Sequence, residues 1–122
     1  MQELIRANSL EDAKITAYHI GFVLGPCINA SGRLDTAARS LALLNAKTKE
    51  EAARLAGDLT ALNQSRKALT EKGKEEAIRI IEATELKNDR VLVVYLPDCH
   101  ESLAGYYSRQ DQGKNITGLP LY

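Results

Sequence analysis

The sequence predicts a mainly α fold: an αα-hairpin with a long linker helix, followed by a short β element from an incomplete α/β domain. Aromatic residues make up only 5% of the 122 residues and tryptophan is absent, so aliphatic side chains must build the core, which suits packed helices. A long amphipathic segment follows Thr48. One continuous apolar run, between Arg90 and Pro97, has the pattern of a buried strand.

The first third of the chain has a helical part and an ambiguous part. Residues 2–13 have a helical pattern. Residues 14–34 contain three glycines, one proline and no acidic residue. Alternate residues in this segment are apolar, as in a strand: Tyr18, Ile20, Phe22 and Leu24. Thr16 equally fits the N-cap of a short helix that Gly25 and Pro26 would end. Both interpretations stay open at this point.

Two helices that follow are expected to form the hairpin. The first spans about 35–45, with Asp35 as a candidate N-cap. Thr48 and Glu51 form a capping box that starts the second helix, which runs to about Glu85 and is roughly 55 Å long. The first helix covers only the first turns of the second. Further along, the second helix leaves an apolar stripe uncovered: Leu62, Leu69, Ile80 and Ile81.

The clearest strand of the sequence runs from Arg90 to Pro97, and its unbroken apolar character predicts burial on both faces. Because one strand is not a sheet, we expect it to begin a domain that this chain does not complete. We also expect self-association, either through the apolar stripe of the long helix or through the edge of the strand at 91–96.

Composition excludes several classes of protein. Sixteen basic and sixteen acidic side chains give a net charge of +0, which excludes a broad basic surface but leaves room for a local basic patch. No apolar run is long enough to span a bilayer, and the residues after Met1 do not resemble a signal peptide. Cys27 and Cys99 lack a zinc-binding spacing and are expected to be free thiols in a reducing compartment. The expected location is cytoplasmic.

The segment from Gly25 to Arg33 is the first candidate site. We interpret it as a rigid turn that presents Asn29, Ser31 and Arg33 to an anion. Small residues let backbone N–H groups approach a phosphate, and arginine supplies a planar fork of donors. The alternative is a helix-capping loop with a surface arginine. Composition alone favours that alternative by roughly two to one, because short turns of this kind usually only connect elements.

Two further polar segments are weaker candidates. Asp98 to Ser102 follow the predicted strand, where His100 is placed for acid–base or hydrogen-bonding roles. The alternative there is a helix N-cap with His100 merely exposed. Asn63 to Lys67 interrupt the apolar stripe of the long helix and fit either a hydrogen-bonding patch or a solvated turn, of which the solvated turn is preferred.

The order of these landmarks resembles a known family. They are the run IGFVLGPCINASGRLD at 20–35, the pair Leu43 and Leu44, the run LTALNQSRK at 59–67, and the stretch from Val91 through HESLAG at 100–105. Together they resemble the signature of the RecJ family of bacterial single-stranded-DNA-specific exonucleases, over about residues 1–105.

The resemblance implies an activity and a domain plan. RecJ enzymes degrade single-stranded DNA from the 5′ end in recombination and repair, with Mn²⁺ or Mg²⁺ bound in an amino-terminal DHH-type domain. On this plan residues 1–34 end that domain, residues 35–88 form a helical linker, and residues 89–122 are the truncated start of a DHHA1-like α/β domain. The tail at 106–122 departs from the family pattern and is assigned no function.

The resemblance also implies a fragment without its metal site. The sequence contains no Asp-His-His motif, and His19 and His100 are its only histidines. We therefore expect no catalytic residue and no metal ligand in this chain, no nuclease activity by itself, and a dependence on missing flanking domains.

Single-stranded DNA is the partner that the resemblance implies. By the family pattern, Ser31, Gly32 and Arg33 would contact the DNA backbone, Asn29 would support them, and His100 would begin the DNA-facing region of the second domain. Two other hypotheses stay open. One is a purely structural helical connector that holds two domains apart, and the other is a fragment of a related phosphoesterase that acts on small nucleotides.

Overall fold

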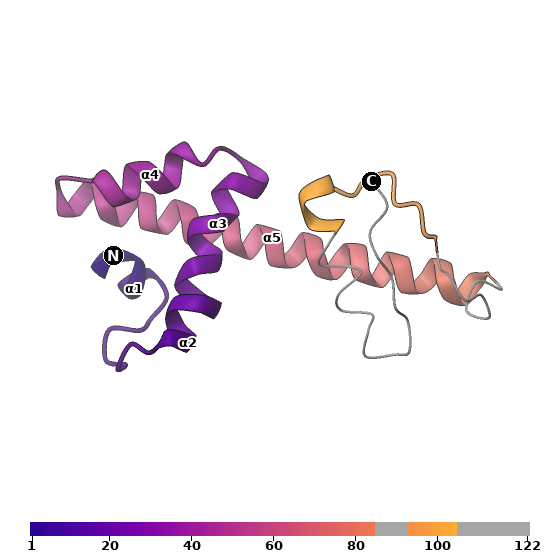
Figure 1. The fold of residues 1–122 in the computed structure, drawn as a ribbon, viewed down its shortest axis with the longest axis horizontal. Coiled ribbons are helices and arrows are strands. Elements are labelled where there is room, and N and C mark those ends of the chain that lie inside the picture. Colours follow the sequence, from indigo (N-terminus) through magenta and orange to yellow (C-terminus); the bar gives the residue numbers. More distant parts are fainter. Residues whose placement is uncertain (85–92, 105–122) are drawn as a thin grey trace. The chain divides into compact units, whose positions relative to one another are not determined.

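The computed structural model describes residues 1–84 and 93–104, and it divides the chain into two compact units, Met1–Arg66 and Lys67–Tyr122. The elements follow in the order α1 (Gln2–Ala7), α2 (Ala17–His19), the π-helical η1 (Ile20–Leu24), α3 (Gly25–Leu34), α4 (Ala38–Asn45), α5 (Lys49–Ala83) and the 3₁₀-helical η3 (Glu101–Leu103) (Figure 1). The prediction of a mainly α fold is confirmed.

Residues 17–34 form one continuous helical run, so the strand interpretation of this segment is wrong. Thr16 precedes the run in an extended conformation, and its N–H donates to Nδ1 of His19 at 3.2 Å. The other open interpretation, a short helix that ends at Gly25 and Pro26, is wrong about that end. Both interpretations of 25–33, a rigid turn and a helix-capping loop, are also wrong, because these residues are helical. Among the described residues no glycine has a positive φ.

A π turn lets the chain pass a proline without leaving the helix. Proline has no N–H, and its ring clashes with the carbonyl group four residues before it. Here Pro26 falls in the first turn of α3, directly after η1. The wider turn pairs the Gly25 N–H with the carbonyl oxygen of Ile20, five residues back. A Cβ at Gly25 would lie 2.8 Å from that oxygen, so the position requires glycine.

The first helix is shorter than the pattern over 2–13 predicts. It ends at Ala7, where the Asn8 side-chain amide donates to the Leu4 carbonyl oxygen at 2.8 Å. Ser9 then adopts a left-handed φ of 57°, which a helix cannot continue through.

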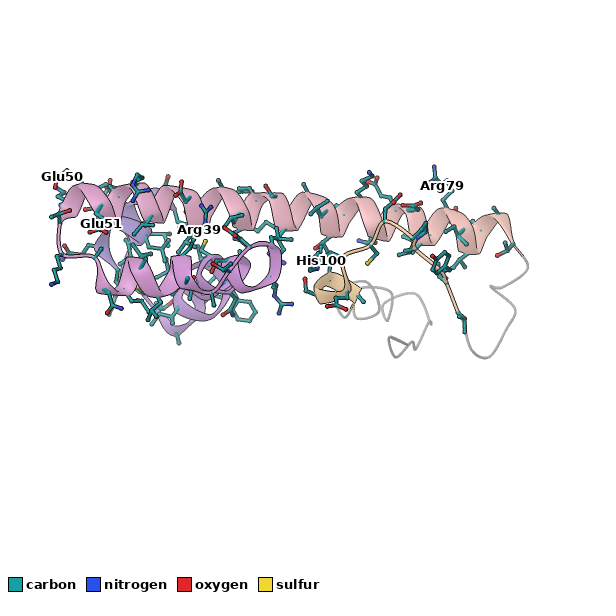
Figure 2. All side chains as sticks on the ribbon, turned by 90° about the horizontal axis from the view of Figure 1, so that it is seen from above. Arg39, Glu50, Glu51, Arg79 and His100 are labelled. Atoms are coloured by element: carbon teal, nitrogen blue, oxygen red, sulfur yellow. The ribbon has the colours of Figure 1, made fainter. Side chains whose placement is uncertain are left out.

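The helix predicted over 35–45 begins at Ala38, so Asp35 is not its N-cap. The Asp35 carboxylate instead forms an ion pair with Arg39, and the Arg39 guanidinium also lies 3.6 Å from a carboxylate oxygen of Asp58 on α5. Arg39 therefore lies between its own helix and α5 (Figure 2). Because its side chain is about half exposed, this pair contributes at most about 1 kcal/mol to stability.

The long helix forms as the capping box predicts. The Thr48 hydroxyl accepts a hydrogen bond from the Glu51 N–H at 3.2 Å, and α5 continues for 35 residues to Ala83, close to the predicted end. α4 runs beside its first turns, so the αα-hairpin is confirmed (Figures 1 and 2).

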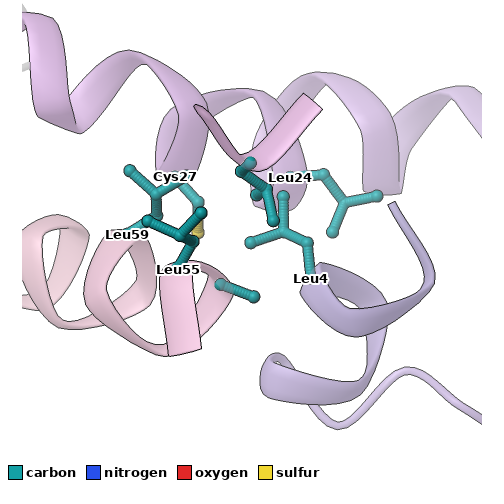
Figure 3. Packing of buried hydrophobic residues seen from close by; sticks show 7 residues of the cluster. Leu4, Leu24, Cys27, Leu55 and Leu59 are labelled. Carbon is teal, nitrogen blue, oxygen red and sulfur yellow. The ribbon is translucent and has the colours of Figure 1, made fainter. Parts of the chain in front are cut away.

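The core of the first unit is small and aliphatic. α1, η1, α3, α4 and α5 each contribute to one cluster of buried side chains (Figure 3): Leu4, Leu24, Cys27, Leu43, Leu55, Ala56 and Leu59. Leu4 and Leu59 are completely buried. This packing holds α3 against α5 and so determines which face of α3 remains outside.

A chain of polar groups crosses the same core. The preferred interpretation of 63–67 as a solvated turn is wrong for Asn63 and Arg66, whereas the other three residues of the segment are exposed. Asn63 and Arg66 are 4% and 8% exposed. The Asn63 amide donates to the Cys27 sulfur at 3.5 Å, and its oxygen accepts from Nε of Arg66 at 3.0 Å. The Cys27 thiol in turn donates to the Asn8 side-chain oxygen at 3.6 Å. Each of these polar side chains has a hydrogen-bond partner, which is what allows polar groups to be buried.

The second unit is described through the later turns of α5 and residues 93–104. Residues 93–96 form no strand, so the predicted β element is wrong over this part of its range; residues 90–92, and the tail at 106–122, lie outside the described residues. A strand needs backbone hydrogen bonds to a second strand, and no described segment supplies one. The apolar run alone therefore did not determine the structure.

The apolar stripe of α5 is only partly exposed. Leu69 is 43% exposed, Leu62 and Ile80 are half-buried, and Ile81 is buried. Self-association through this stripe stays a prediction. In the described ranges, no helix combines the length and the apolar character that crossing a membrane would need.

Candidate nucleic-acid interface

The outer face of α3 carries three of the predicted DNA-contacting residues. The side chain of Asn29 and the backbone of Gly32 are exposed, and Arg33 is half-buried near the carboxyl end of the helix. Ala30 and Ser31, between them in sequence, face the core and are completely buried. Helical periodicity thus separates Ser31 from the other three, so its side chain does not share their surface.

Ser31 fixes the end of α3 from inside. Its hydroxyl oxygen lies 2.7 Å from the hydroxyl oxygen of Ser40 on α4, which itself donates to the Ile28 carbonyl oxygen at 2.5 Å. The Asp35 N–H donates to the Ser31 carbonyl oxygen at 2.8 Å and closes the last turn. These bonds hold the backbone around Arg33 to the neighbouring helix.

An exposed pair of aromatic rings lies on the amino-terminal part of the same helical run. Tyr18 and Phe22 are 64% and 71% exposed, and their rings stack with centroids 5.1 Å apart and planes 25° apart. The His19 and Tyr18 rings are nearly perpendicular, with their centroids 5.9 Å apart. Between Lys14 and Arg33 the sequence contains no acidic residue, so the helical run that carries these rings has no carboxylate side chain of its own.

His100 belongs to the second unit, where it is exposed and caps η3 (Figure 2). Its Nδ1 accepts from the Ser102 N–H at 3.3 Å and lies 2.7 Å from the Ser102 hydroxyl oxygen. The alternative interpretation of this segment, an N-cap with an exposed histidine, therefore describes its local structure.

A metal centre does not fit the described residues. Across 1–84 and 93–104, no three His, Cys, Asp or Glu side chains come together in a way that could hold an ion. A divalent ion in a hydrolytic site needs several such ligands.

Comparisons with known proteins identify the relatives of this chain. It is 35% identical over 108 residues, 86% of its length, to the single-stranded-DNA-specific exonuclease RecJ of Escherichia coli. It is 38% identical over 98 residues to the RecJ of Haemophilus influenzae and 30% identical over 93 residues to that of Bacillus subtilis. The chain is RecJ-related. No family model matches it.

The RecJ match concerns a limited part of those proteins. The aligned segment spans 19% of the E. coli protein, 17% of the H. influenzae protein and 12% of the B. subtilis protein. The similarity to RecJ was predictable from the ordered landmarks of the sequence, since these cover both the first unit and the start of the second.

Sequence reasoning missed two features of this RecJ-related surface. Tyr18 and Phe22 were noticed only as part of an alternating pattern, although their spacing of four residues on a helix would have paired them. The buried role of Ser31 was also missed. Its signal was weak, because only the position of Ser40 on another helix shows that a partner exists.

Proposed function

We propose that this chain is part of a 5′–3′ single-stranded-DNA exonuclease of the RecJ type that acts in DNA recombination and repair. The observation that carries the proposal is the 35% identity to E. coli RecJ over 108 residues. Within such an enzyme, α3 contributes contacts to the DNA backbone and α5 is the helix between two domains. The proposal includes the boundaries at 34/35 and 88/89, a cytoplasmic location and flanking domains that supply the rest of the enzyme.

Each residue of the proposed interface has a distinct role. Arg33 pairs with a phosphate through its planar fork of donors. Asn29 and the backbone at Gly32 line the same exposed face of α3, where a strand can approach closely. Ser31 acts from inside by fixing the helix end. His100 lies at the start of the DNA-facing region of the second domain.

Arg33→Ala tests the backbone contact. A phosphate contact positions a strand without reading its bases. The variant should therefore lose affinity by about the same factor for every single-stranded sequence. The salt slope of log K should fall by roughly 0.7, the value of one single-strand phosphate. Arg33→Lys should recover only part of the affinity, because a point charge lacks the fork. Titrations of labelled oligonucleotides at several salt concentrations measure both quantities.

Arg54→Ala is the matched control, since it removes the same charge from an exposed position on α5. The connector hypothesis is favoured by one observation, the uninterrupted 35 residues of α5. It predicts the opposite result for Arg33→Ala: a lower melting temperature with an unchanged salt slope. That outcome would make Arg33 a structural residue and remove the proposed phosphate contact.

Hydrolysis is proposed to need residues outside this chain. The family's Mn²⁺ or Mg²⁺ would be bound by the amino-terminal domain, and the residues described here do not fit such a centre. We expect residues 1–122 to release no nucleotides from single-stranded DNA with either ion. Gel and acid-soluble release assays measure this. A metal-dependent activity that co-purifies with the chain through independent preparations would contradict the expectation.

A further inference from the structure

The stacked rings of Tyr18 and Phe22 are unusual because they are exposed to solvent. The chain has one phenylalanine and few aromatic residues, yet this phenylalanine is 71% exposed while Leu24, two residues later, is 2% exposed. Ile20 between the rings is 56% exposed. Exposed apolar groups that cluster in this way typically mark a binding surface.

The rings are held in place before any ligand arrives. Nδ1 of His19 accepts from the Thr16 N–H and lies 2.9 Å from the Thr16 hydroxyl oxygen, which fixes the histidine ring. That ring meets Tyr18 edge-on, with planes 84° apart, and Tyr18 stacks on Phe22. A flat aromatic surface with restricted rotamers loses little entropy when a planar ligand stacks on it.

The charges of the segment that carries the rings favour an anionic ligand. The segment from Lys14 to Arg33 carries basic residues at both ends and no acidic residue between them. Phe22 and Arg33 are separated by 11 positions of one helical run, which corresponds to roughly 16 Å along its axis. Proteins that bind single strands combine stacking aromatic rings with basic groups that follow the backbone, over several nucleotides.

We propose that Tyr18 and Phe22 form a base-stacking platform for single-stranded nucleic acid, with Phe22 roughly 16 Å from the proposed phosphate contact of Arg33 along the same helical run. The inference rests on the proposed function and extends it from the backbone to the bases. Stacking of this kind tolerates any base, because each base has a π face. The platform would therefore raise affinity without adding sequence preference.

Phe22→Ala in the full chain tests the platform, with two probes of equal length and charge: a labelled thymidine oligonucleotide and its abasic counterpart. Loss of one stacked base should weaken binding of the thymidine strand by about 5- to 150-fold. Binding of the abasic strand and the salt slope should stay unchanged, since no charge is removed. Phe22→Trp should retain the affinity. Leu41→Ala, which removes an exposed apolar side chain from α4 outside the cluster, should have no effect.

The outcomes separate this inference from the proposed function. If the wild-type chain binds neither probe, the proposed function fails for this chain and the platform with it. If the wild-type chain binds both probes and Phe22→Ala binds them with unchanged affinity, only the platform is overturned. If Phe22→Ala instead changes the molar mass measured by light scattering while affinity is constant, the rings form a protein interface and the platform is again overturned.

Discussion

Alanine at Gly25 should lower the free energy of unfolding by about 2 kcal/mol, the size of a typical overpacking penalty. The new Cβ would lie 2.8 Å from the carbonyl oxygen of Ile20. That oxygen cannot move away easily, because it belongs to the backbone and accepts the Gly25 N–H in the π turn. The sign of the change is informative, because replacing glycine by alanine inside a helix normally raises the free energy of unfolding, by about 1 kcal/mol. A decrease would therefore indicate the clash at the π turn.

Gly57→Ala is the matched control for this prediction. Gly57 lies in α5, and a Cβ there would meet no atom within 4 Å. It should raise the free energy of unfolding by about 0.5–1 kcal/mol. Urea titrations followed by far-ultraviolet circular dichroism measure both variants. Equal stability of Gly25→Ala and the wild type would show that the π turn relaxes to an ordinary helix at no cost.

Removing the Asn63 side chain should also lower the free energy of unfolding, by about 2–3 kcal/mol. Its amide is 4% exposed, accepts from the charged Arg66 at 3.0 Å and donates to the Cys27 sulfur at 3.5 Å. Hydrogen bonds to charged groups contribute about 1.5–3 kcal/mol, more than bonds between neutral groups. Asn63→Ala should therefore shift the urea midpoint strongly.

Gln64→Ala provides the comparison for Asn63→Ala. Gln64 is the next residue of the same helix but is exposed, so its loss should change stability by less than about 0.5 kcal/mol. A double-mutant cycle with Cys27→Ala then isolates the contact between α5 and α3. If Asn63→Ala and Gln64→Ala have the same small effect, the buried polar chain contributes nothing to stability.

The long helix and its start were predictable because the information is local. The Thr48 hydroxyl and Glu51 are three residues apart, and the apolar stripe repeats within one element. The segment at 17–34 was ambiguous for an equally physical reason. A π turn advances fewer degrees per residue than an α-helix, so it shifts the apolar pattern and lets Tyr18, Ile20 and Phe22 all lie outside.

Features that depend on distant parts of the chain could not be predicted in this way. The local polarity of Asn63 and Arg66 suggested solvent, whereas their burial depends on Cys27, more than thirty positions away. The apolar run at 93–96 suggested a strand, but pairing needs a second segment that the local sequence does not contain. Of the candidate interface, helical periodicity places Asn29 and Arg33 on one face of α3, where Asn29 is exposed and Arg33 half-buried, and their contact with DNA stays a prediction.

If α3 binds DNA as proposed, the contact between the hydroxyls of Ser31 and Ser40 affects the fraction of molecules that are in the binding conformation. Apparent affinity falls in proportion to the fraction of molecules in the competent conformation. Ser40 joins α4 to the last turn of α3, so we expect its hydroxyl to increase the fraction of molecules in which Arg33 keeps its helical position. If α3 binds DNA as proposed, we expect a substitution at Ser40, which is 7% exposed, to weaken that binding without direct contact, by lowering the fraction of molecules in the competent conformation.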